Sequence, residues 1–449
     1  MIISIYTILI IFYIISKFTS NPIISFSIGI FAVIAILFSC FRAKGLYLYS
    51  GISFFMIGFL LFIYNDLPWY SFFLHFETML GMLSLFLVLP FINCIIRVGK
   101  YDKNLSLLLQ HGITSLSTLY RRSFIVCHFL GLFLNIATIP LLTSSLKRTI
   151  GQLPKKSADK FNTQNLLRAY ALCLTWSPLE IMVIISLDIT RNPYYKLFPI
   201  IFTIAVLAIL ADWAFSHFKH SKVPLEIEYK TEINIKKVIR KIIEMLFMLF
   251  ILVLLASFIL HKLNKGFLFS IVILLVPISF VWAILIRKTR RYLSITIPHW
   301  KERTKGLSNY FFMFLSAGLF VEMLSQSHAL SFLQSSFSAI SDRTLLFYLM
   351  IGLYFLLTAF IGFHPLVSLT LLSELLKPIL AEVSSISLTV VLISCSLSTV
   401  MYSPYNLSVS ILADELKLNP YKLGVWNLLY AIFYMLLSIT IAYLLSGII

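Results

Sequence analysis

The sequence has little charge and few cysteines. Only 12% of its 449 residues are charged, whereas 59% are hydrophobic, and the mean hydropathy is +0.94. A typical globular domain carries about 25% charged residues. This composition excludes a soluble globular protein.

Motifs of the common enzymes and of ATP-driven pumps are also missing. The chain contains no P-loop, no Rossmann glycine pattern, no metal-spaced histidine pair and no nucleophile elbow. Its five cysteines are scattered through apolar segments, so we interpret them as packing residues. We therefore expect no enzyme, no catalytic residue, no metal site and no cofactor.

What the chain has instead is a series of long apolar runs. Residues 23–40, 242–260 and 267–286 are each long enough to cross a hydrocarbon core of about 30 Å. Lipid cannot satisfy free backbone groups, and the continuous runs do not alternate as barrel strands do. The sequence therefore predicts an all-α polytopic membrane protein.

The net charge of +18 is concentrated between the apolar runs. Most of the 36 Lys and Arg residues fall in four segments, residues 97–103, 147–168, 219–241 and 287–305. An excess of basic residues in cytoplasmic loops explains this pattern without nucleic acid. We expect a multi-pass protein of the cell membrane with a cytoplasmic N-terminus.

A repeat is the most specific feature of the chain. Trp176-Ser177-Pro178-Leu179-Glu180 is followed 226 residues later by Tyr402-Ser403-Pro404-Tyr405-Asn406. The same offset relates Tyr195-Lys196-Leu197 to Tyr421-Lys422-Leu423, and a second pair of segments begins at Ile139 and His364. These matches predict a duplicated chain.

The charge pattern orients the two copies in opposite directions across the membrane. We predict an extra N-terminal transmembrane helix at residues 1–21, repeats at 22–217 and 242–449, and a basic cytoplasmic linker at 218–241. Each repeat is expected to contain a re-entrant hairpin and a proline-broken helix. Paired interruptions of this kind mark binding sites in inverted-repeat transporters.

Pro178 and Pro404 carry the physical argument for a site. Each lacks an amide hydrogen and clashes with the preceding turn, so its helix opens there. Opened backbone at membrane depth requires surrounding protein or water, and a new helix N-terminus attracts an anion. We place Ser177, Ser403 and Asn406 with the prolines in a solute site; simple kinks are the alternative.

Glu180 lies two residues beyond the first proline, where the second repeat has Asn406. An ionisable side chain near the middle of a membrane is costly and rarely incidental. We predict that Glu180 binds the coupling ion, H⁺ or Na⁺; a structural hydrogen-bonding role is the alternative.

With its paired hairpins and broken helices, the chain resembles the ion transporter superfamily of divalent-anion:sodium symporters, citrate carriers and arsenite permeases. The Ser-Asn-Thr hairpin signature of its sodium-coupled members is similar to Leu134-Asn135-Ile136-Ala137-Thr138, which keeps the Asn and a nearby Thr. The second tip, Gly362-Phe363-His364-Pro365, departs from it. The resemblance implies substrate or cation contacts at Asn135 and Thr138.

His364 occupies the matching place in the second hairpin, and Ser368 follows on its downstream arm. His364 either contacts an anionic substrate or closes the tip through backbone hydrogen bonds. The expected function is a secondary active transporter that moves a small anion, an organic acid or an oxyanion, by alternating access. A lipid-modifying enzyme or an envelope-assembly partner is the other class, and a homodimer remains open.

Overall fold

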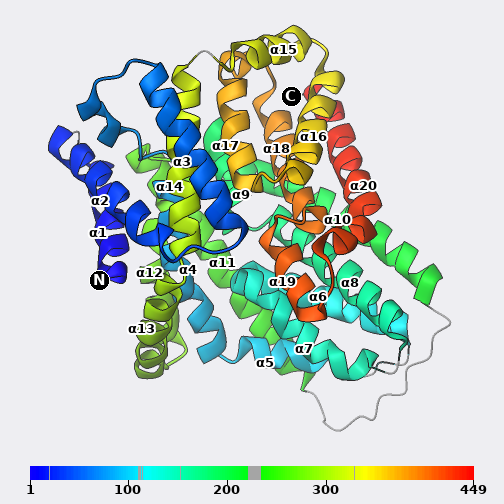
Figure 1. Ribbon diagram of the computed structural model, residues 1–449. Coiled ribbons are helices and arrows are strands. Elements are labelled where there is room, and N and C mark those ends of the chain that lie inside the picture. The colour runs from blue at the N-terminus through cyan, green and yellow to red at the C-terminus, as the bar shows by residue number, and fades with distance from the viewer. Residues whose placement is uncertain are drawn as a thin grey trace. The chain divides into compact units, whose positions relative to one another are not determined.

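The computed structural model describes residues 1–19, 21–109, 113, 115–151, 153–220, 234–327 and 329–448. The elements in these ranges are α-helices and short 3-10 helices (Figure 1). Ten helical segments among them are long and apolar enough to cross a membrane. The prediction of an all-α polytopic membrane protein is confirmed.

Several helices have almost the bounds that hydropathy predicts, because long apolar runs specify them locally. They are α2 (Pro22–Cys40), α3 (Leu46–Tyr64), α10 (Tyr194–His220), α11 (Ile235–Leu263), α12 (Phe267–Leu285), α14 (Ser308–Gln326) and α20 (Pro420–Ser446). The first predicted helix is α1 (Ile2–Ser16).

Three expectations about local structure are wrong. The apolar character of residues 70–96 predicts one membrane-crossing helix, but the structure has a 3-10 helix, η1 (Trp69–Leu74), followed by α4 (Leu80–Val98). The basic segments interpreted as loops contain the start of α8 (Lys155–Thr175) and all of α13 (Thr289–Lys305). Basic residues are good helix formers, so charge alone did not distinguish a loop from an amphipathic helix. Most of the predicted linker, residues 221–233, lies outside the described residues.

The chain folds into two compact units, and each unit takes elements from both halves of the sequence. One contains Met1–Ile95, Leu255–Ala339 and Thr370–Ile379. Within it, α14 packs along α3 and α2, and α1 contacts α2 and α13. α15 (Ser331–Ser341) begins in the same unit.

Glycine allows α3 and α14 to approach closely in this unit, where they lie side by side (Figure 1). A Cβ atom on Gly58 would lie 3.0 Å from the backbone nitrogen of Phe320, and one on Gly51 would lie 2.4 Å from the ring of Phe312. Small residues at such contacts are the usual means of packing helices within lipid, where no hydrophobic force drives their association.

The other unit contains Ile96–Leu254, Ile340–Leu369 and Leu380–Ile449. Its elements include α5 (Tyr101–Ser106), η2 (Leu107–Leu109), α6 (Leu116–Leu134), η3 (Asn135–Ala137), α7 (Thr138–Ile150), α8, α9 (Ile181–Thr190), α10, α16 (Thr344–Ile361), α18 (Ser385–Tyr402), α19 (Leu407–Leu416) and α20. α17 (Pro365–Leu376) begins here, and η4 (Lys377–Ile379) follows it. All residues predicted for the solute and coupling sites fall in this unit.

Candidate functional site

The first helix break lies between α8 and α9. The helix ends at Thr175, and Ser177 and Pro178 occupy the non-helical segment, where the Ser177 hydroxyl accepts a hydrogen bond from the Leu179 amide at 3.3 Å. Glu180 caps α9, with its Oε1 3.5 Å from the amide nitrogen of Met182. The proline therefore opens the helix as the sequence predicts.

The second break repeats this arrangement. The Ser403 hydroxyl accepts from the Tyr405 amide at 3.3 Å, and Asn406 caps α19 by accepting from the Ser408 amide at 3.0 Å. Each of these residues lies 226 positions after its counterpart in the first break. The sequence repeat is thus also a repeat of local hydrogen bonding.

The repeat continues to the far ends of the two short helices. The C-cap residues of α9 and α19 are Arg191 and Lys417, both with a φ of 55°, and their amides bond to the carbonyl groups of Leu187 and Ala413. These pairs keep the same offset of 226. A left-handed C-cap at a non-glycine residue is uncommon, so its occurrence in both copies supports a duplicated element.

The first hairpin consists of α6, η3 and α7. A Cβ atom on Gly131 would lie 2.5 Å from the Cys173 sulfur, and Asn165 donates to the Tyr120 carbonyl at 2.7 Å. α6 and α8 therefore run parallel. α7 has 13 residues, about 20 Å of helix, and it carries the chain from the end of α6 back towards the start of α8.

Asn135 forms the tip of this hairpin. It has a φ of 50°, and its Oδ1 accepts hydrogen bonds from the Ile136 amide at 2.7 Å and from the Tyr170 hydroxyl. Tyr170 lies eight residues before Pro178, about two helical turns away. The first hairpin tip therefore contacts α8 several residues before the helix break, and not at the break itself.

The second hairpin consists of α16 and α17. The Tyr354 hydroxyl of one arm donates to the Ser368 carbonyl of the other at 2.9 Å, and Gly362 turns the chain with a φ of 114°. This tip lies at the second break, since Ser403 donates to the Ala359 carbonyl at 3.0 Å and a Cβ atom on Gly362 would lie 3.5 Å from the Tyr405 ring.

His364 caps α17 at this tip. Its Nδ1 accepts a hydrogen bond from the Leu366 amide at 3.3 Å, and the side chain is half-buried. That bond requires an unprotonated Nδ1, because a protonated ring nitrogen has no free lone pair. The geometry favours tip closure, one of the two roles expected for His364.

The two broken helices run antiparallel. The hydroxyls of Thr190 at the end of α9 and Thr389 in the first turns of α18 are 2.7 Å apart, while α19 packs against α7 and α8. Pro178 lies 12 residues before Thr190, about 18 Å along the first broken helix. Pro404 lies 15 residues after Thr389, about 22 Å along the second broken helix. Both breaks therefore lie at a similar depth in the unit.

Backbone carbonyls near the breaks are largely occupied. The Tyr194 hydroxyl donates to the Trp176 carbonyl, and the hydroxyls of Ser408 and Ser410 donate to Val400 and Pro404 at 2.7 and 3.1 Å. Free carbonyls at a helix break suit a cation. In this conformation side-chain hydroxyls donate hydrogen bonds to these carbonyls, so Glu180 is the stronger candidate for a cation ligand.

Glu180 is 5% exposed. Among the described residues, its carboxylate accepts hydrogen bonds from the amides that it caps and forms no ion pair. A buried carboxylate without a counter-charge is strongly unfavourable unless it is protonated or binds a cation. Asn406, at the matching cap, has no such requirement.

Two predicted solute ligands have unused hydrogen-bonding capacity. The hydroxyls of Thr138, at the start of α7, and Ser368, in the first turn of α17, are fully buried and have no partner within the described residues. Most buried hydroxyls in proteins are hydrogen-bonded, so unpaired ones require an explanation such as an absent ligand. Each lies on the returning arm of its hairpin.

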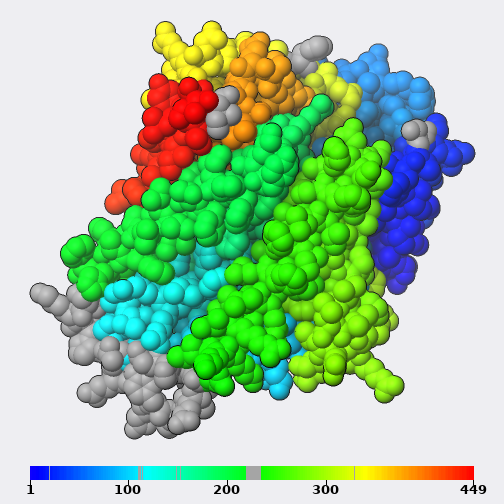
Figure 2. Space-filling view, turned by 180° about the vertical axis from the view of Figure 1, so that it is seen from behind, coloured from blue at the N-terminus to red at the C-terminus, as the bar shows by residue number. Residues whose placement is uncertain are grey.

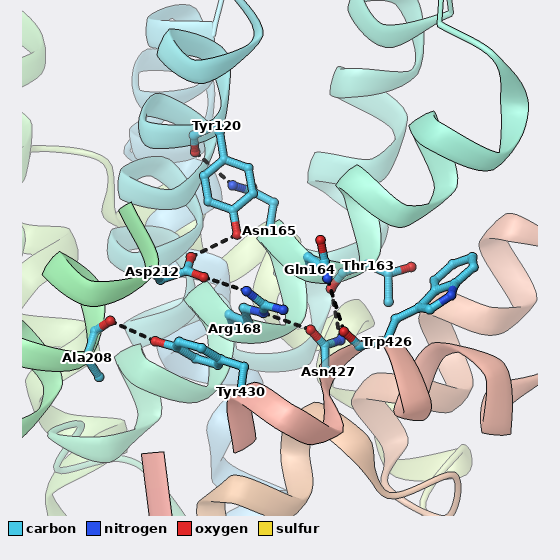
Figure 3. A network of polar contacts seen from close by, with 10 residues as sticks. All are labelled: Tyr120, Thr163, Gln164, Asn165, Arg168, Ala208, Asp212, Trp426, Asn427 and Tyr430. Carbon is cyan, nitrogen blue, oxygen red and sulfur yellow. Dashed lines mark hydrogen bonds and ion pairs between the residues drawn. The ribbon is translucent and has the colours of Figure 1, made fainter. Parts of the chain in front are cut away.

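The sequence interpretation missed a buried charge network centred on Arg168 of α8 (Figure 3). Its Nη1 lies 2.6 Å from Asp212 Oδ1, its Nε lies 2.9 Å from Asn427 Oδ1, and its guanidinium stacks 4.4 Å from the Tyr430 ring. The Tyr120 hydroxyl donates to the other Asp212 oxygen at 2.8 Å. The network joins α6, α8, α10 and α20.

Asp212 could have been identified from the sequence as a residue with a buried partner. It is the single acidic residue within the apolar run 197–217, and such residues usually face a partner inside the protein. Arg168 was harder to identify, because it ends a basic segment and was interpreted as part of a loop.

Gly424 of α20 fixes the approach of this helix to the second break. A Cβ atom there would lie 2.2 Å from the Tyr402 carbonyl oxygen, a backbone atom that cannot move away cheaply. We expect Gly424→Ala to lower the unfolding free energy by about 1–3 kcal/mol, measured by denaturant titration in detergent. Gly447→Ala is the control, because its nearest neighbour would be at 3.8 Å. Equal stability of both variants would contradict the close approach.

Comparison with known proteins supports the fold. The structure is similar to the crystal structure of the YdaH transporter of Alcanivorax borkumensis, described as having an unusual topology, with a TM-score of 0.57. The match covers 89% of this chain and 98% of that one at 11% sequence identity. No protein-family model and no curated protein matches the sequence. At this identity the likeness establishes a shared membrane-protein fold.

Proposed function

We propose that the protein is a secondary active transporter that moves a small anionic solute by alternating access, coupled to H⁺ or Na⁺. The observation that carries the proposal is the pair of antiparallel helices, each opened by a proline at matched positions and each held by a hairpin of its own half. Broken helices paired in this way are typical of transporters built from inverted repeats.

Both breaks offer chemistry suited to an anion. α9 and α19 begin there, and the N-terminus of a helix is the positive end of its dipole. The unpaired hydroxyls of Thr138 and Ser368 add neutral donors. An organic acid or an oxyanion fits these groups, as the proposed kinship with the ion transporter superfamily also implies.

The coupling ion is assigned to Glu180. A proton would neutralise the buried carboxylate directly, and Na⁺ would do so by coordination. Either ion removes the cost of an isolated charge and thereby favours one conformation over another. We propose a cell-membrane location with a cytoplasmic N-terminus, in accord with the basic loops.

The experiment that tests this function is counterflow of labelled solute in proteoliposomes loaded with candidate anions. A transporter accelerates exchange of labelled for unlabelled anion and accumulates the anion when an H⁺ or Na⁺ gradient is imposed. Chemical conversion of a lipid or solute without gradient-dependent uptake would instead support the membrane-enzyme alternative. Absence of both would favour a role in assembly.

We expect Thr138→Val and Ser368→Ala to raise the KM for the transported anion roughly 10- to 100-fold, since a hydrogen bond to a charged group contributes about 1.5–3 kcal/mol. Their thermal stability should not fall, because neither hydroxyl has a partner among the described residues to lose.

Thr143→Val on the same helix is the matched control. Its hydroxyl donates to the Ile139 carbonyl at 2.8 Å, within its own helix. An unchanged KM in Thr138→Val and Ser368→Ala, measured from initial uptake rates, would remove these hydroxyls from the solute site.

A further inference from the structure

The N-terminal part of α11 combines basic and apolar residues in a way that the proposed transport site does not use. The helix has 29 residues, about 44 Å, so its ends extend beyond a hydrocarbon core of about 30 Å. Lys236, Lys237, Arg240 and Lys241 all fall within its first two turns. These residues are therefore suited to the headgroup region.

An apolar stripe continues directly from this basic end. Ile239, Ile243 and Phe247 recur every four residues on one face, and they are 51%, 60% and 59% exposed. This stretch of α11, green in Figure 2, lies on the surface of its unit. The face is suited to contact with acyl chains.

The basic and apolar residues line one open groove of about 440 Å³. The described residues that line it all lie on one face of α11, and they are Lys236, Ile239, Arg240, Ile243, Glu244 and Phe247. The groove thus has a cationic end and an apolar end.

Glu244 does not cancel the positive charge of the groove. Its carboxylate accepts from Lys241 at 2.7 Å, from the Tyr101 hydroxyl at 2.9 Å and from Arg240 Nε at 3.0 Å. The Arg240 guanidinium has five N–H donors, of which this bond uses one, and 80% of the side chain is exposed. Lys236 is exposed and makes no ion pair with any described residue.

We propose that this groove is a binding site for an anionic phospholipid. Lys236 and Arg240 hold the phosphate, and an acyl chain lies along Ile239, Ile243 and Phe247. The occupant is a lipid rather than a soluble anion, because the surface that lines the groove is largely apolar and the basic residues lie at the end of a membrane span. The site is independent of the proposed transport function.

The test is lipid retention by the full-length protein, measured by native mass spectrometry after extraction from mixed phosphatidylcholine and phosphatidylglycerol nanodiscs. We expect selective retention of phosphatidylglycerol. The double variant Lys236→Gln and Arg240→Gln should weaken its binding roughly 30-fold, since each basic residue near a membrane surface contributes about 1 kcal/mol.

Two further variants separate this site from general surface charge. Arg290→Gln with Arg291→Gln removes the same charge from exposed positions of α13 and should leave retention unchanged. Phe247→Ser should weaken lipid retention through the apolar end alone. Equal losses in both double variants, wild-type retention in Phe247→Ser, or displacement of the lipid by inorganic phosphate would each overturn the proposal.

Discussion

Glu180→Gln is expected to abolish gradient-driven accumulation of the solute while leaving expression and solute exchange intact. Gln keeps the shape of the side chain and can still cap α9, but it neither releases a proton nor attracts Na⁺. Removing a buried carboxylate that forms no ion pair with a described residue should also leave thermal stability unchanged or raise it. Uptake into proteoliposomes with and without an imposed H⁺ or Na⁺ gradient measures the effect.

Asn406 provides the matched control for this prediction. It caps α19 as Glu180 caps α9, but it carries no titratable group. Asn406→Ser retains a capping side chain and should leave the ion dependence of uptake unchanged. If Glu180→Gln shows the ion dependence of the wild type, Glu180 does not carry the coupling ion and its role is structural.

Breaking the Arg168–Asp212 pair should produce the largest loss of stability. Both side chains are buried, so Asp212→Asn leaves the Arg168 charge without compensation. Loss of one partner from a buried pair costs about 3–5 kcal/mol. We expect this decrease in the unfolding free energy by denaturant titration in detergent, together with poor expression.

The double variant Arg168→Met with Asp212→Leu distinguishes lost charge from lost packing. Replacing both charges with apolar side chains of similar size removes the unpaired ion, so most of the lost stability should return. A double variant no more stable than Asp212→Asn would show that the hydrogen bonds to Asn427 and Tyr120 contribute more than charge balance does.

The elements predicted correctly from sequence depend on local physics. Hydropathy specified spans such as α3, because a lipid environment requires a continuous hydrogen-bonded helix. The breaks at Pro178 and Pro404 follow from the missing proline amide, and the constant offset between them follows from the repeated sequence. Amphipathic segments such as α13 were misjudged, because their helicity depends on the surface that their apolar face covers.

The candidate site likewise has features that the sequence specifies locally and features that depend on tertiary packing. The residues at the breaks and the carboxylate of Glu180 could be selected from the sequence, since their chemistry is visible in the residue type and its position beside a proline. The sequence by itself therefore determined the long apolar helices, the repeat and the breaks. Only the tertiary structure decided that the hydroxyls of Thr138 and Ser368 have no partner among the described residues, that the second tip meets its break, and that Arg168 binds Asp212. Those contacts join residues distant in the chain, so they depend on which helix faces pack together, which a local pattern does not specify.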